Sequence, residues 1–270
     1  MRREPAEENI EMKRNLIPNQ IPKLAIQKGL FVKEIISQET GVKDLLILDL
    51  GSGEGGTSSV LLEENRVISF DIKLNRLKEQ INNSLLKKIN GDAISLPFKY
   101  NLFDLIILQD VIEHVSEIEK MLTEVLRVLK KGGYIYISTP NRYSLINILS
   151  DPHWGKPFIS LLNREQIKKY FLKNFRKNEL NRNDIAQLFS LNKINLVFDG
   201  QFEKKLNTDF AVEWLVNGND GIIWSKFHKK LLQFTKFVKA DRLLLKAANR
   251  KYGFVNKYFT PTFYFLLKKK

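Results

Sequence analysis

The chain has 270 residues, a formal net charge of +14 and no cysteine. This length can form one large domain or a domain with an insertion. Because cysteine is absent, disulfides, thiolate metal sites and cysteine nucleophiles are excluded. Residues 1–8 contain no apolar signal segment, and no apolar run approaches the ~18 residues of a membrane-spanning helix. We therefore expect a cytoplasmic protein.

Residues 21–37 form the first predicted element, an amphipathic helix. Its apolar residues fall near one side, and Lys23, Lys28 and Lys33 fall on the opposite side. Gly41 follows as a stop signal. We expect the apolar side to pack against the core of the protein.

A glycine-rich turn follows the next apolar segment. Residues 45–50 are apolar except for Asp49, which predicts a strand buried on both faces. Glycines follow at 51, 53, 55 and 56, and residues 57–64 can form a helix. Glycine permits positive φ angles and close approach of a ligand to the main chain. A helix start also presents free N–H groups to anions, so this unit predicts a site for an anionic ligand.

The spacing of these glycines fits two cofactors. Gly51, Gly53 and Gly56 match the dinucleotide fingerprint, and Gly51, Gly53 and Gly55 match the fingerprint for S-adenosylmethionine (SAM). A second apolar segment ends in Asp71, where a carboxylate is placed to accept ribose hydroxyls. This part of the sequence leaves both cofactors open.

Four later segments distinguish the two cofactors. They are residues 91–98, which begin with Gly91-Asp92, and residues 103–110, 129–133 and 135–142. Their order and spacing resemble class I SAM-dependent methyltransferases, in particular the small-molecule branch that includes the ubiquinone-biosynthesis O-methyltransferases. The resemblance covers about residues 40–145 and says little about the methyl acceptor.

The resemblance implies a Rossmann-like α/β fold with a seven-stranded, mostly parallel sheet, an antiparallel last strand, helices on both faces and a helical insertion near the C-terminus. It also implies that the glycine turn holds the methionine end of SAM. The Asp92 carboxylate would accept a hydrogen bond from the adenine amine, although Asp92 could instead cap a turn. The implied cofactor-binding residues are Asp49, Gly51, Ser52, Gly53, Gly55, Asp71, Ile72, Asp92, Ala93 and Gln109.

Local patterns predict the remaining elements. Ser116 and Glu119 have the spacing of a capping box for a helix that passes through Leu129 and ends at Gly132-Gly133. Other helices are expected over residues 75–88, over residues 164–175, and from a cap at Asn183 or Asp184 to Phe189. Strands are expected over residues 86–90, 103–108, 134–138, 194–199 and 261–268.

We divide the chain into an N-terminal helical segment (1–43), a SAM-binding core (44–199), a basic helical insertion (200–260) and a final core strand (261–270). Residues 200–270 carry 15 Lys and Arg against 5 acids. Apolar residues from Trp224 to Ala248 recur at near-helical steps beside lysines. The insertion is therefore expected to be a lid, a solvated basic face, or an element that contacts a lipid-linked substrate or the inner face of the membrane. A nucleic-acid partner is not expected, and the oligomeric state is not determined.

Histidine is the side chain whose ordinary pKa lies nearest neutrality. His114 follows the strand over 103–108, at the edge of the sheet where ligands bind. His153 lies in the loop after the strand over 134–138, and both are candidate catalytic bases. His228 lies inside the basic insertion and is not expected to take part. Glu113 beside His114 suggests a metal, but adjacent residues of a helix point to different sides, so no metal site is expected.

These features together predict a SAM-dependent methyltransferase that acts on a small-molecule or lipid-linked acceptor, at oxygen. Two alternatives stay open. One is an NAD-type Rossmann oxidoreductase, and the other is a catalytically silent binding protein that the basic insertion recruits to membranes.

Overall fold

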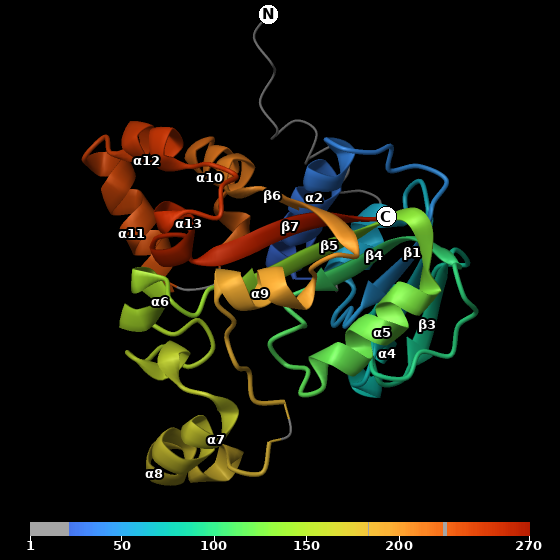
Figure 1. Cartoon of the computed structure of the whole chain (residues 1–270), viewed down its shortest axis with the longest axis horizontal. Coiled ribbons are helices and arrows are strands. Elements are labelled where there is room, and N and C mark those ends of the chain that lie inside the picture. The colour runs from blue at the N-terminus through green and yellow to red at the C-terminus, as the bar shows by residue number, and fades with distance from the viewer. Residues whose placement is uncertain (1–21, 183, 224–225) are drawn as a thin grey trace, which may run out of the picture.

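The computed structural model describes residues 22–182, 184–223 and 226–270. Seven strands form one sheet in the order β3-β2-β1-β4-β5-β7-β6 (Figure 1). Strand β7 is antiparallel to both β5 and β6, and the pairs among β1 to β5 are parallel. The predicted Rossmann-like fold is therefore confirmed. The strands are β1 (Leu46–Leu50), β2 (Arg66–Asp71), β3 (Leu86–Asn90), β4 (Phe103–Gln109), β5 (Leu129–Pro140), β6 (Phe202–Leu206) and β7 (Thr262–Lys269).

Helices cover both faces of the sheet. On one face, α5 (Ile118–Val128) and α9 (Leu191–Val197) share a core with Leu48 and Leu50 of β1. On the other face, α2 (Lys23–Ser37) and α3 (Gly56–Leu61) share a core with Ile47. Because alternate residues of a strand point to opposite faces, the apolar segment of β1 contributes to both cores.

The shorter elements lie around this sheet. The remaining helical segments between β2 and β6 are α4 (Leu74–Glu79), α6 (Leu145–Leu149), η2 (Ile159–Leu161), α7 (Arg164–Gln166), the π-helical segment η3 (Ile167–Leu172), α8 (Lys173–Phe175) and η4 (Lys177–Glu179). The expected helix over residues 164–175 is confirmed as the run α7–η3–α8, with a π segment in its centre.

Two predicted helices are too long. The helix expected over residues 75–88 is α4 alone, because Gln80 takes extended backbone angles and sends its amide to the carbonyl of Gly53. Leu86 then begins β3. The helix expected over residues 57–64 is α3, which begins one residue earlier and ends at Leu61.

The segment before β6 contains two wrong predictions. Residues 194–199 were expected as a strand, but Leu191, Ile194 and Phe198 are buried on one side of helix α9 and its C-cap, and the Ser190 side chain caps the first turn. Their spacing of three and four residues is that of a helical face. Residues 184–189 were expected as a helix but have no helical structure. The proposed cap Asn183 lies outside the described residues.

The predicted capping box of α5 is also wrong. Helix α5 starts at Ile118 with Glu117 at the N-cap, and no side chain caps it. Glu119 instead points to solvent, with a carboxylate oxygen 3.8 Å from the Lys193 ammonium. The helix ends at Val128, before the glycine pair, because Leu129 pairs with β4 as the first residue of β5.

Four helices between β6 and β7 lie at one end of the sheet, on the left of Figure 1 beside α6. They are α10 (Thr208–Val216), α11 (Lys226–Phe237), α12 (Asp241–Ala247) and α13 (Phe254–Tyr258), with the 3-10 turn η5 (Asp220–Ile222) after α10. Strand β6 falls inside the span 200–260, so the helical part of the insertion begins at Thr208. Trp224 lies outside the described residues. Within the described residues, no helix is long and apolar enough to cross a membrane.

Candidate active site

One cavity of about 1520 Å³ lies beyond the carboxyl ends of β1, β2 and β4. It is lined by the glycine turn, by Asp71 and Asp92, by the loop that follows β4, and by helices of the insertion. Ligand pockets commonly measure about 300–1,000 Å³. The cavity therefore has room for a second molecule beside a nucleotide cofactor.

The glycine turn takes the backbone conformation that its residues predict. Gly51, Gly53 and Gly55 have φ angles of 76°, 53° and 77°. A Cβ atom on Gly51 would lie 2.5 Å from Cγ2 of Val111, so the loop after β4 packs directly on the turn. Both features require glycine at position 51.

The two predicted acids behave differently at the cavity wall. Asp71 is buried, and its two carboxylate oxygens accept hydrogen bonds from the backbone N–H of Gly53 at 2.8 Å and of Lys73 at 2.7 Å. Asp92 is exposed, and its Oδ1 accepts from the N–H of Ile94 at 3.2 Å. Asp71 therefore ties the glycine turn to the end of β2, and both acids line the same cavity.

Asp49 lies beneath the turn. Its Oδ2 accepts a 2.6 Å hydrogen bond from the Ser58 hydroxyl, and the residue is buried. Burial raises the pKa of Asp49 to about 6, and repulsion from Asp71 adds to the rise, whereas the bond from Ser58 lowers it. Asp49 is thus placed to organise the turn.

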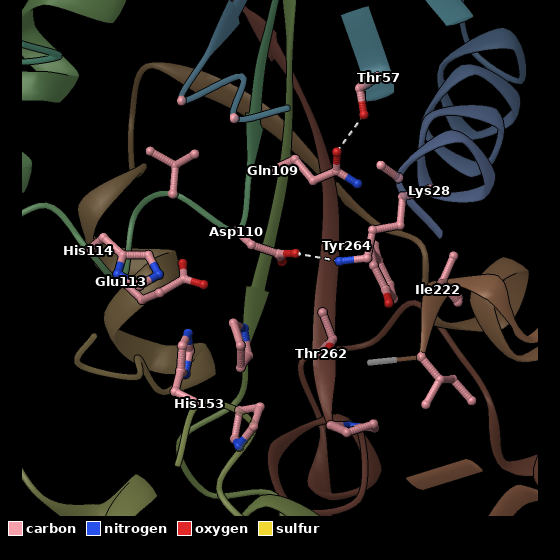
Figure 2. Close-up of a pocket in the computed structure, with 18 of the residues that line it drawn as sticks. Lys28, Thr57, Gln109, Asp110, Glu113, His114, His153, Ile222, Thr262 and Tyr264 are labelled. Atoms are coloured by element: carbon pink, nitrogen blue, oxygen red, sulfur yellow. Dashed lines mark hydrogen bonds and ion pairs between the residues drawn. The ribbon is translucent and has the colours of Figure 1, made fainter. Parts of the chain in front are cut away.

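The remaining predicted cofactor residues also lie at this end of the cavity. Ser52, Ile72, Ala93 and Gln109 are among its lining residues. The Gln109 amide oxygen accepts a 2.5 Å hydrogen bond from the hydroxyl of Thr57, at the start of α3 (Figure 2). Nine of the ten predicted residues therefore line this wall, and the tenth, Gly55, belongs to the same turn but does not line the cavity.

Gln80 was missed by the sequence analysis. It is buried, and its Nε2 donates to the Ser52 hydroxyl at 3.0 Å and to the carbonyl of Gly53 at 2.7 Å. No local pattern marks it, because its partners are nearly thirty residues earlier in the chain.

Lys28 was placed on the wrong side of α2. It is buried, and its ammonium donates to Oδ2 of Asp110 at 3.0 Å, while the Ser138 hydroxyl donates to Oδ1 at 2.8 Å (Figure 2). Burial raises the pKa of Asp110, but Lys28 and Ser138 outweigh burial and hold the pKa below its ordinary value. Asp110 also has a positive φ of 55°, a strained conformation that often marks functional sites.

The two candidate bases meet at the cavity wall. The rings of His114 and His153 have centroids 5.2 Å apart, and Figure 2 shows Glu113 beside them. The Nδ1 of His114 is 3.0 Å from the backbone carbonyl of Asp184. Glu113 is fully buried, and its Oε2 accepts from the Thr139 hydroxyl at 3.0 Å.

Enclosure by protein shifts the pKa of each group in this cluster. Burial lowers the pKa of His114. The His153 ring is open to the cavity but surrounded by protein on its other sides, which lowers its pKa to about 4, with further lowering by His114. Burial, with repulsion from Asp110, raises the pKa of Glu113 to about 8. Both imidazoles are therefore neutral at neutral pH.

His228, which the sequence analysis set aside, also lines the cavity, from α11. Burial lowers its pKa. It lies outside the group formed by Glu113, His114 and His153.

Comparisons with known proteins identify the domain. Residues 48–137 match the family model described as a methyltransferase domain. An uncharacterized protein of Methanocaldococcus jannaschii is 36% identical over 124 residues, which cover 43% of this chain and 53% of that protein. A fatty-acid O-methyltransferase of Mycolicibacterium smegmatis is 26% identical over 151 residues, which cover 52% of this chain and 53% of that enzyme. A solved S-adenosylmethionine dependent methyltransferase of Mesorhizobium loti superposes with a TM-score of 0.55 at 13% identity, over 88% of this chain and 96% of that chain.

The matches are informative about the cofactor and not about the acceptor. The chain spans about half or less of the length of the first curated relatives that it matches. Other matched relatives are named for transfer to nitrogen or to carbon. The family match and the strand order agree on SAM, and they decide against the dinucleotide that the glycine spacing left open. Residues 48–137 and the sheet around them form a class I SAM-dependent methyltransferase domain.

Proposed function

We propose that the protein transfers the methyl group of SAM to an oxygen atom of an acceptor that has a long apolar, lipid-like part. The observation that carries this proposal is the continuity of the cavity, which reaches from the glycine turn to the walls of α10, α11, α12 and α13. A small polar acceptor would not need an apolar chamber of that extent.

Each end of the cavity suits one reactant. At the cofactor end, the glycine turn would hold the methionine end of SAM, Asp71 and Ile72 would hold the ribose, and Asp92 and Ala93 the adenine. At the other end, the lining side chains of the insertion are mainly apolar. They include Leu215, Leu231, Leu232, Leu244, Ala247, Val255 and Phe259.

The chemistry at the junction needs orientation above all. The sulfonium of SAM is already activated, so the protein must hold the acceptor oxygen in line with the methyl group. His114 and His153 lie on the wall near the cofactor end, and as neutral imidazoles they can help to remove a hydroxyl proton. We propose that they activate the acceptor.

The outer surface of the insertion supports delivery from a membrane. Large apolar side chains are exposed on α11, α12 and the turn between them, among them Phe234, Phe237, Val238 and Leu243. Lys236 and Lys239 alternate with them along the chain. Helices that expose apolar and basic residues together bind anionic membrane interfaces, so we propose peripheral membrane contact through this surface.

Calorimetric titration with S-adenosylhomocysteine tests the cofactor site. Asp71→Asn should weaken binding by more than about tenfold, because an NH2 group replaces one of the two acceptor oxygens, so that one backbone N–H and a ribose hydroxyl lose an acceptor. Asp199→Asn, which changes an exposed acid paired with Lys204, should bind like the wild type. Equal affinity of the two variants would refute the assignment of Asp71, and absence of binding by the wild type would refute the proposed activity.

Comparison of metabolites between a strain that has this gene and a strain that lacks it tests the acceptor class. The deletion strain should accumulate a compound lighter by one methylene in the organic-solvent extract. If the lighter compound appears only in the aqueous extract, the lipid-like acceptor is wrong. Stabilisation of the purified protein by NADH and not by SAM would instead favour the oxidoreductase alternative.

A further inference from the structure

We propose that Glu113, His114 and His153 form a binding site for a divalent transition-metal ion. Each residue offers one ligand atom, and these three atoms lie within 4.8 Å of one another. Figure 2 shows the three side chains together at the pocket, in a separate group from Lys28 and Tyr264. The set contains two imidazoles and one carboxylate, which is the ligand set of many catalytic zinc and non-haem iron sites.

Glu113 supplies an oxygen that lacks a partner. The side chain is fully buried, and Oε1 has no hydrogen-bond partner among the described residues. Its other oxygen accepts from the Thr139 hydroxyl at 3.0 Å, which fixes the orientation of the carboxylate. A buried polar atom without a partner is costly, and a bound cation would satisfy it.

His114 is held in the orientation that metal ligands adopt. The carbonyl oxygen of Asp184 can only accept a hydrogen bond, so the Nδ1 atom that lies 3.0 Å from it must carry the proton. The lone pair of the imidazole is then on Nε2. Metal-binding histidines usually donate their second ring N–H to a carbonyl or carboxylate in this way.

The local backbone explains how two adjacent residues reach one site. Residues 112–114 form a turn between β4 and α5, and α5 begins only at Ile118. The sequence-based argument against a metal assumed a helix, in which neighbours point to different sides. His153 comes from the loop after α6, almost forty residues later, and completes the set.

The ligand types indicate the class of ion. Imidazole favours zinc, cobalt, nickel, iron and copper over magnesium, which prefers oxygen ligands. Ligands placed about 2.1 Å from zinc are roughly 3.4 Å apart in a tetrahedron. The side chains would therefore have to move together by about 1 Å on binding.

The surroundings leave room for a reactant on the ion. Asp110 does not compete for it, because its oxygens already accept from Lys28 and Ser138. Three protein ligands leave a coordination position open toward the cavity. If the proposed function holds, the two imidazoles would hold the ion and would no longer act as bases, and an acceptor hydroxyl bound to the ion would release its proton to water. Its oxygen would then bond to the methyl carbon, and the methyl–sulfur bond would break with its electron pair going to sulfur.

The test is calorimetric titration of the chelator-treated full chain with Zn²⁺ in excess Mg²⁺, together with the visible spectrum of the Co²⁺ form. We expect one equivalent of Zn²⁺ to bind the wild type. His153→Ala and Glu113→Gln should each weaken binding by about 100-fold or more. His228→Ala is the matched control, since it removes a histidine of the same cavity outside the cluster, and it should bind like the wild type.

Other results would overturn the metal site. They are absence of Zn²⁺ binding by the wild type, equal binding by all four proteins, or displacement of Zn²⁺ by Mg²⁺. Titration of the same samples with S-adenosylhomocysteine separates this outcome from failure of the proposed function. If the wild type binds S-adenosylhomocysteine but not Zn²⁺, the metal site is refuted. If the wild type does not bind S-adenosylhomocysteine, the methyltransferase assignment is refuted.

Discussion

Gly51 and Gly132 share a left-handed backbone but have different surroundings. Their φ angles are 76° and 73°, yet a Cβ atom would meet Val111 at 2.5 Å in the first case and nothing within 4 Å in the second. The cost of an alanine at positive φ, about 1–2 kcal/mol, applies to both positions. Only at Gly51 does a close contact add to it.

We therefore expect Gly51→Ala to weaken S-adenosylhomocysteine binding by about tenfold or more, which is about 1.4 kcal/mol. Gly132→Ala should lose stability alone and bind normally. Calorimetric titration and urea unfolding of both variants measure the two effects. Equal binding by the two variants would mean that the contact between the turn and Val111 does not shape the cofactor site.

The buried Asp49 predicts a pH-dependent stability. Its pKa is about 6 in the folded protein, mainly because of burial, and 3.8 is the ordinary value. The folded state thus binds more protons than the unfolded state between these values, and the contribution of Asp49 to stability falls as pH rises from about 4 to 6. The difference between the two pKa values corresponds to about 3 kcal/mol.

Asp49→Asn removes this dependence and keeps an oxygen that can accept from Ser58. Urea unfolding without cofactor should show that the variant gains more stability relative to the wild type at pH 7.5 than at pH 4. A difference that stays constant between the two pH values would contradict the raised pKa.

At the scale of elements, Asn141 joins the end of β5 to the end of the insertion. It is fully buried, and its amide nitrogen donates to the carbonyls of Asn256, Lys257 and Thr260 at 2.8 to 3.2 Å. These carbonyls belong to α13 and to the turn that leads into β7. Asn141 therefore holds the chamber wall against the sheet.

Asn141→Ala should lower the free energy of unfolding by about 2–3 kcal/mol, because buried carbonyls lose their donor. Asn192→Ala, on the exposed side of α9, should change it by less than about 0.5 kcal/mol. Urea unfolding measures both changes. Similar values for the two variants would show that Asn141 does not join the insertion to the core.

Helix α9 shows why some elements were predicted wrongly. Residues 194–199 contain Ile194, Leu196, Val197 and Phe198, a short apolar run that strands and helices share. The Ser190 cap and the burial of Leu191 and Ile194 on one side stabilise the helical conformation of this segment. Those contacts are with the face of the sheet that α5 also covers, and they do not exist in the isolated segment.

At the scale of the whole molecule, the insertion places apolar and basic side chains on the outside of the apolar part of the cavity. Phe237 is 84% exposed and Leu243 is 67% exposed. Phe237 is the last residue of α11 and Leu243 lies in the first turn of α12, and Figure 1 shows both helices to one side of the sheet. A face that closes one end of the substrate cavity and binds a membrane would deliver a lipid directly to the site.

The double variant Phe237→Glu, Leu243→Glu should reduce co-sedimentation with phosphatidylglycerol vesicles by about tenfold or more, because each acid opposes apolar insertion and the anionic surface. Leu196→Glu is the control, since Leu196 is 70% exposed on α9. Binding of the wild type should also fall with added salt. If the double variant and the Leu196→Glu control co-sediment equally with the vesicles, the proposed membrane contact is refuted.

The cofactor cradle was predictable from the sequence because its causes are local. Positive φ angles need glycine at positions 51, 53 and 55, an apolar run with a fixed length predicts β1, and an acid after the next run predicts Asp71. The antiparallel β7 was also predicted correctly from the end of the chain.

Only the tertiary structure decided what Lys28, Gln80, Glu113 and His153 do. In the sequence, Lys28 cannot be distinguished from any other lysine on the polar side of a helix. In the structure, Oδ2 of Asp110 lies 3.0 Å from its ammonium. Glu113 and His153 become neighbours only when the loops after β4 and α6 meet at one edge of the sheet. Such pairings depend on how distant segments pack, whereas the turn and the strands depend on the residues within them.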